Sequence, residues 1–153
     1  MFYMIYLLLI FIYIICGIGV GRNLSSFIDV ITLAYTLLPC ILVLSCTRSL
    51  RAFGSAFSFV LGQKTPDLPQ SRDALRSVKM TWITAVLFGS LCFMIGMVNS
   101  ISHLDLSAAD LGAYFLRDLS VAILSLFYPA LICIILLPVY FLLKKHIAKL
   151  GGV

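Results

Sequence analysis

Residues 119–143, LSVAILSLFYPALICIILLPVYFLL, decide the fold of this chain. The stretch holds no charged residue over about 25 positions, and a helix needs only about 20 apolar residues to cross a bilayer. Its small or weakly polar residues recur every three or four positions, which places them on one stripe of a helix. They are Ala122, Ser125, Pro129 and Cys133. We therefore expect a membrane-spanning helix whose small face lines an internal feature of the protein.

The composition of the whole chain agrees with a membrane location. Of the 153 residues, 62% are hydrophobic and 11% charged, whereas roughly a quarter of the residues of a soluble domain are charged. One all-α integral membrane domain over residues 1–153 is expected. The net charge of +5 does not indicate nucleic-acid binding, because the basic residues flank apolar stretches. The five cysteines have no metal-like spacing and are expected to fill apolar space as free thiols.

Hydropathy predicts four transmembrane helices. Their approximate bounds are 2–20, 28–46, 81–101 and 119–143. Ser107 and Asp110 resemble a capping box, so the last helix is expected to begin near Ala108 and to end near Lys149. At 1.5 Å per residue it would exceed the thickness of the hydrocarbon core and protrude from the membrane.

The segment between the second and third spans, residues 47–80, is polar enough to lie outside the hydrocarbon. Residues 47–62 are amphipathic, and they form either a helix in the headgroup region or a frayed extension of the second span. Pro66 and Pro69 predict a linker over residues 63–70.

A short helix over residues 71–79, with Ser71 as its N-cap, should follow this linker. It places Arg72, Arg76 and Lys79 on one face. These three residues face either solvent and lipid phosphates or an acidic partner that docks from the cytoplasm.

The basic residues also predict the orientation. Nine of the eleven lysines and arginines lie in the 47–80 segment or after residue 143, and only Arg22 and Arg117 lie on the other side. The positive-inside rule then places both termini and the 47–80 segment in the cytoplasm.

Several short motifs, in order along the chain, resemble the MotA/TolQ/ExbB proton-channel family, and MotA in particular. They are Phe27, Ile28 and Asp29 at the entry of the second span, IGMVN at 95–99, Leu104-Asp105 and Leu111-Gly112 in the short outer loop, and Leu137-Pro138 followed by Lys144-Lys145. The family's large cytoplasmic domain is reduced here to residues 48–80. The family's Gly-Thr in the third span falls here on Cys92-Phe93, and its Thr-Thr in the fourth span falls on Leu124-Ser125, where Ser125 alone keeps a hydroxyl.

The resemblance implies a homopentameric ring in the bacterial inner (cytoplasmic) membrane. Its third and fourth spans would line the centre and surround a single-span partner of the MotB/TolR/ExbD type, whose Asp carries the ion. This chain has no ionisable residue deep in any expected span, so another chain would have to supply the titratable group. The candidate pore-lining or partner-facing residues are Gly89, Cys92, Phe93, Gly96, Ala122, Ser125 and Pro129.

Two single residues of the last helix carry separate expectations. Asp118 is placed at the mouth of the pore, where it would gather cations, or else it lies solvated at the membrane interface. The Ser125 hydroxyl lies either beside a partner carboxylate or bonded back to the carbonyl of residue 121.

The function expected from this resemblance is an ion-channel or motor ring, as in a stator, that uses the ion-motive force. The alternative is a non-conducting scaffold or accessory ring that assembles or modulates another membrane complex. An enzyme is not expected, because no catalytic constellation, phosphate loop or pair of carboxylates is present. Neither a cofactor nor a metal ion is predicted.

Overall fold

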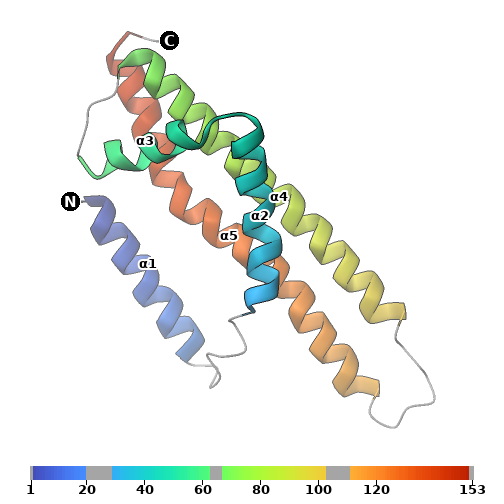
Figure 1. The fold of residues 1–153 in the computed structure, drawn as a ribbon. Helices are drawn as coiled ribbons and strands as arrows, with labels where there is room; N and C mark the ends of the chain where they lie inside the picture. The colour runs from blue at the N-terminus through green and yellow to red at the C-terminus, as the bar shows by residue number, and fades with distance from the viewer. Residues whose placement is uncertain (1, 20–28, 63–66, 103–110, 152–153) are drawn as a thin grey trace.

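The computed structural model describes residues 2–19, 29–62, 67–102 and 111–151, and the ordered elements in these ranges are all α-helices. The helices are α1 (Phe2–Gly19), α2 (Val30–Cys46), α3 (Leu50–Val60), α4 (Leu68–Ser102) and α5 (Leu111–Lys149). Figure 1 shows α4 and α5 as a long antiparallel pair, with α2 lying across it, α3 crossing one end and α1 standing to one side. The all-helical prediction is confirmed.

The prediction of four membrane spans is wrong in number. Two helices in the described residues are long and apolar enough to cross a bilayer, Leu68–Ser102 and Asp118–Lys149, and a third span exists only if α2 and α3 are counted as one broken span. The axis turns by 109° between α2 and α3. The apolar stretch Tyr3–Cys16 of α1 is counted with the shorter apolar helices and not with these spans.

The predicted linker and short helix before the third span are also corrected. Helix α4 begins at Leu68 and continues without a break to Ser102, and Ser71 is buried inside it. Pro69 does not interrupt the helix because it lies in the first turn, where a backbone N–H has no helical partner in any case. The predicted capping box at residues 107 and 110 lies outside the described residues.

A tight turn separates α2 from α3 and explains why the amphipathic segment is a helix of its own. The N–H of Arg48 donates to the Ser45 carbonyl at 3.0 Å, and the N–H of Ser49 donates to the Leu44 carbonyl at 2.9 Å. This pair of bonds is a Schellman motif, whose left-handed position is usually occupied by glycine. Here Arg48 occupies it, with a φ of 52°.

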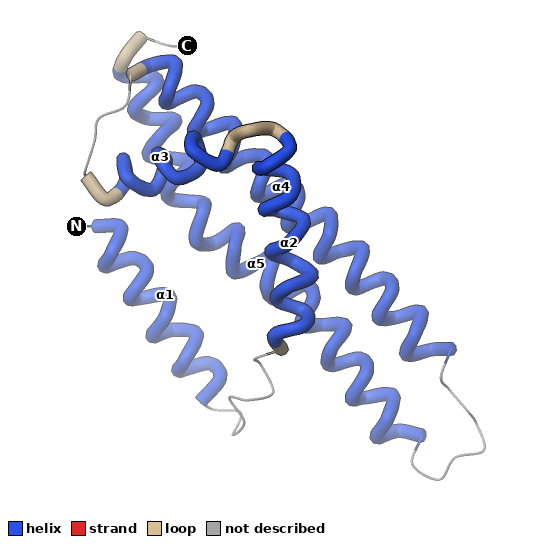
Figure 2. Tube along the Cα trace, in the orientation of Figure 1, coloured by secondary structure: helices blue, strands red, loops and turns tan. Residues whose placement is uncertain are grey.

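Helix α3 binds the rest of the bundle through its apolar face. Ala56 is fully buried, in a cluster to which α1, α4 and α5 also contribute. The other buried members are Tyr3, Ala74, Val78, Leu136, Val139 and Leu143. Phe59 contributes a ring contact with His146, with the centroids 4.7 Å apart. The hydrophobic core therefore lies at the end of the bundle that α3 crosses (Figure 2).

Close approach of α4 and α5 depends on two glycines. A Cβ atom on Gly89 would overlap the ring of Pro129 and lie 2.8 Å from the carbonyl oxygen of Ser125. A Cβ atom on Gly96 would lie 2.8 Å from the Cβ of Ala122. Small residues let the backbones of membrane helices approach closely, and van der Waals packing then supplies the association energy that lipid cannot.

Pro138 of α5 lies opposite a group that compensates for the missing donor. Pro138 has no N–H to give to the carbonyl of Ile134, and the hydroxyl of Tyr6 donates to that carbonyl at 2.9 Å. The Tyr3 hydroxyl reaches the adjacent carbonyl, that of Ile135, at 3.4 Å. Helix α1 is therefore attached to α5 where the helical hydrogen-bond ladder is interrupted.

We predict that Gly89→Ala destabilises the protein by about 1–3 kcal/mol, because the new methyl group must displace a proline ring and a backbone carbonyl. The control is Gly54→Ala in α3, where nothing lies within 4 Å of the added Cβ. Removing a glycine from that exposed helical position should stabilise it by roughly 0.5–1 kcal/mol. Thermal unfolding in detergent measures both changes, and equal melting temperatures for the two variants would contradict the proposed packing.

A second prediction concerns the attachment of α1. Tyr6→Phe removes the donor to the Ile134 carbonyl and should lower the free energy of unfolding by roughly 1 kcal/mol. Tyr13→Phe is the matched control, because Tyr13 is 80% exposed and its loss of a hydroxyl should change nothing. If both variants have the melting temperature of the wild type in the same detergent, the hydrogen bond does not hold α1 in place.

Candidate functional site

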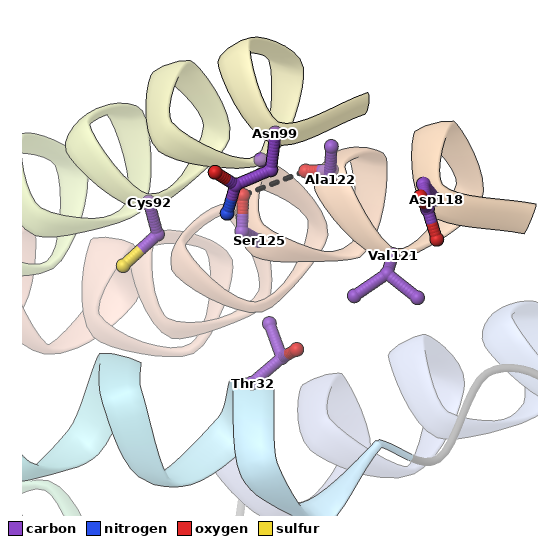
Figure 3. A pocket seen from close by; sticks show the side chains of 8 residues that line it. Thr32, Cys92, Asn99, Asp118, Val121, Ala122 and Ser125 are labelled. Carbon is purple, nitrogen blue, oxygen red and sulfur yellow. Dashed lines mark hydrogen bonds between the residues drawn. The ribbon is translucent and has the colours of Figure 1, made fainter. Parts of the chain in front are cut away.

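A pocket of about 330 Å³ opens where α2 faces the α4–α5 pair. Its lining comes from three helices and comprises Thr32, Cys92, Gly96, Asn99, Asp118, Val121, Ala122 and Ser125. Figure 3 shows Thr32 projecting from α2 toward the side chains of α4 and α5. We call this cavity the three-helix pocket.

The three-helix pocket is polar but nearly uncharged. Hydroxyl, thiol and amide groups line it, and Asp118 is the one charged residue among its lining residues. Asp118 lies about two helical turns from Ser125 on the same face of α5. Such a site offers hydrogen bonds to a guest while providing no fixed charge except at one end.

Ser125 is buried at the floor of the pocket, and its hydroxyl is already occupied. It donates to the carbonyl of Ala122 at 2.6 Å (Figure 3), and the Gly89 carbonyl lies at 3.5 Å, the limit of a hydrogen bond. The expected back-bond is thus present, but to residue 122 and not to residue 121. The carbonyl of Ser125 itself has no helical donor, because residue 129 is a proline without an N–H. This carbonyl lies against Gly89.

Helix α2 is positioned at the pocket by Asp29. Its carboxylate accepts hydrogen bonds from the N–H of Ile31, at 3.1 Å, and from the hydroxyl of Thr32, so it caps the helix and fixes a pocket residue at the same time. The N–H of Asp29 in turn donates to the hydroxyl of Tyr128 on α5 at 2.8 Å. One residue therefore joins the start of α2 to α5 beside the pocket.

The structure brings together most of the pore-lining residues predicted from the sequence. Cys92, Gly96, Ala122 and Ser125 line the three-helix pocket, together with the predicted mouth residue Asp118. Gly89 and Pro129 are buried against each other at the helix contact below it. Phe93 is half-buried and does not line the pocket.

The predicted docking residues Arg72, Arg76 and Lys79 are exposed on α4. They lie toward the end of the bundle that α3 crosses, away from Asp118. Arg76 lines a pocket that is distinct from the three-helix pocket.

Sequence reasoning missed three lining residues, Thr32, Asn99 and Val121. Asn99 carried a usable signal, because it is an amide near the end of an otherwise apolar stretch, one helical turn from Gly96 and two turns from Cys92. Thr32 could have been linked to Asp29 by its i, i+3 spacing, but its position against α5 requires the three-dimensional packing of α2.

No group of three or more histidine, cysteine, aspartate or glutamate side chains converges on a metal site within the part of the chain that the structure describes. Comparisons with protein-family models, with curated proteins and with solved structures found no match for this chain. The site is therefore interpreted from its own geometry.

We predict that Asp29→Ala lowers the stability of the bundle by about 1 kcal/mol, the usual cost of losing a side-chain N-cap. Asp29→Asn keeps an acceptor for the Ile31 N–H and should cost less than half as much. Thermal unfolding in detergent distinguishes the two variants. A lower unfolding midpoint for Asp29→Asn than for Asp29→Ala would contradict the capping role of Asp29.

Proposed function

We propose that this chain is a membrane subunit of the MotA/TolQ/ExbB type that forms a ring around a single-span, Asp-bearing partner and carries ions with it. The observation that carries the proposal is the three-helix pocket, whose small and weakly polar residues come together from α2, α4 and α5. A five-membered ring in the bacterial inner membrane, with both termini in the cytoplasm, is the assembly that the sequence resemblance favours.

The charge distribution supports a partner. No Asp, Glu, Lys, Arg or His occurs between Met80 and Ser102 of α4 or between Leu119 and Leu143 of α5. Ionisable groups within membrane segments usually mark ion pathways. A pathway through this subunit therefore needs a carboxylate from another chain.

The pocket offers neutral hydrogen-bond partners to such a carboxylate. Asn99 can donate through its amide nitrogen and adds no fixed charge that would trap the ion, whereas the Thr32 hydroxyl already donates to Asp29. Asp118, at the end of the pocket, attracts cations toward it by Coulomb interaction. The guest carboxylate would take up a proton on one side and release that proton on the other, which moves one proton past Ser125.

The exposed surface suits assembly in a bilayer. Large apolar side chains are exposed along α2, α4 and α5, far more than a soluble monomer presents. In a membrane these faces contact lipid or neighbouring copies.

A non-conducting scaffold is the second candidate, and one observation favours it. The Ser125 hydroxyl is satisfied by its own helix, and no buried side-chain oxygen or nitrogen among the described residues lacks a hydrogen-bond partner. The pocket thus does not require a guest in order to be stable.

The two functions are separated by ion flux. We expect liposomes containing the chain and a single-span apolar peptide with one central Asp to take up protons under an imposed potential, as read by a pH-sensitive dye. The same peptide with Asn in place of Asp should give no uptake. Flux that is absent with both peptides, although both bind, would favour the scaffold.

The role of the pocket is tested by Ser125→Leu, which we expect to lower the flux at least tenfold because the larger side chain fills the cavity beside the guest. Ser120→Leu is the matched control, since Ser120 is exposed on the same helix and its hydroxyl bonds to its own backbone. Equal flux in the two variants would remove Ser125 from the pathway.

Copy number and occupancy have separate readouts. Native mass spectrometry of the detergent-extracted protein should give a mass of five chains, and a monomer would contradict the ring.

Cys92 lines the pocket and Cys46 is exposed on α2, so the Asp-bearing peptide should slow maleimide labelling of Cys92 and leave that of Cys46 unchanged.

A further inference from the structure

A second pocket, of about 350 Å³, lies at the other end of the bundle, at the turn between α2 and α3. We call it the arginine pocket. Its lining comprises Thr47, Arg48, Ser49, Ala52, Asp73, Arg76 and Met80. Two guanidinium groups, two hydroxyls and one carboxylate thus surround a cavity that α4 closes on one side.

The arginine pocket lies at the boundary between charged and uncharged chain. On α4 the last charged residue is Lys79, and the run that begins with Met80 is uncharged up to Ser102. Residues 73, 76, 80, 83 and 87 share one face of this helix at spacings of three and four. Ile83 and Leu87 are 48% and 63% exposed on that face, so an apolar track leads away from the cationic pocket.

The backbone at Arg48 is a second, independent observation. Arg48 holds a φ of 52° at a position where glycine is the usual residue, and a non-glycine residue there costs of order 1 kcal/mol. A strained position that keeps a long cationic side chain is evidence that the side chain itself is used. The side chain that occupies this position is one of the two guanidinium groups of the pocket.

The guanidinium groups are available to a ligand. Within the described residues, no ion pair joins Asp73 to Arg48 or to Arg76. Two arginines and one aspartate give the pocket a formal charge of +1. That charge complements a phosphodiester, which carries a single negative charge, and Asp73 can accept a hydrogen bond from a hydroxyl of its headgroup.

We propose that the arginine pocket binds the headgroup of an anionic phospholipid, a phosphodiester with a hydroxyl-bearing headgroup such as phosphatidylglycerol. The phosphate lies between Arg48 and Arg76, which suit it because guanidinium groups recognise phosphate in a bidentate manner. The acyl chains follow the apolar face of α4 past Ile83 and Leu87. Basic pockets between membrane helices are a known form of lipid recognition, and this site does not depend on the proposed ion conduction.

The test titrates the delipidated full chain in detergent with short-chain phosphatidylglycerol and reads binding by native mass spectrometry. We expect Arg76→Gln and Arg48→Gly each to weaken binding about fivefold, as for the loss of one cation near an anionic lipid. Arg72→Gln removes the same charge from a neighbouring exposed position outside the pocket, and should change binding less than twofold. Arg48→Gly should melt no lower than the wild type, because glycine relieves the positive φ, so its weaker binding is not unfolding.

Three further ligands separate the source of the phosphate and the class of partner. Short-chain phosphatidylcholine and free glycerol phosphate should each bind at least fivefold more weakly than phosphatidylglycerol, since one lacks the net charge and the other the acyl chains. Equal binding of either, or an equal loss of binding in Arg72→Gln, would overturn the proposal. Hexaglutamate that binds as tightly as the lipid would assign the pocket to an acidic protein segment and would also overturn it.

Discussion

Helix α5 lacks a backbone donor at Pro129 and at Pro138, and each gap is met by a different neighbour. In a medium without water a carbonyl that loses its helical partner must find another group, or its burial costs several kcal/mol. At Pro138 the partner is a tyrosine hydroxyl of α1, which donates to the Ile134 carbonyl. At Pro129 the freed carbonyl of Ser125 lies against Gly89 of α4, where a Cβ atom would be only 2.8 Å from its oxygen. The two prolines of α5 thus face two of its neighbours, α1 and α4.

The contact at Gly89 and the three-helix pocket have a common cause. Where the small residues of α4 and α5 meet, the backbones touch and leave no space. Toward Asp118 larger polar side chains such as Asn99 replace them, and α2 supplies the third wall through Thr32. The pocket therefore begins where close packing ends, and the same stripe of residues serves both parts.

The sequence predicted this stripe because periodicity within one helix depends only on spacing. It also predicted the helical nature of α3, since the alternation of aromatic and polar residues over residues 50–60 is amphipathic. It did not predict the length of α4, because Pro69 was interpreted as a break although proline in a first turn removes no helical hydrogen bond. Nor did it predict the left-handed Arg48, since nothing in the local residue types indicates a Schellman turn when glycine is missing. Four spans were predicted because apolarity alone does not show where a helix ends, and α2 ends after 17 residues at the 109° turn before α3.

The two ends of the bundle differ in the kind of polar group they present. At the Asp118 end the polar lining of the three-helix pocket is uncharged except for Asp118 itself. At the α3 end the polar groups of the arginine pocket include two arginines and an aspartate, which suit an anionic ligand. Helix α4 contributes residues to both pockets and runs unbroken between them, so it holds them at a fixed separation. Lipid bound at the arginine pocket would therefore set the depth at which the three-helix pocket lies in the bilayer.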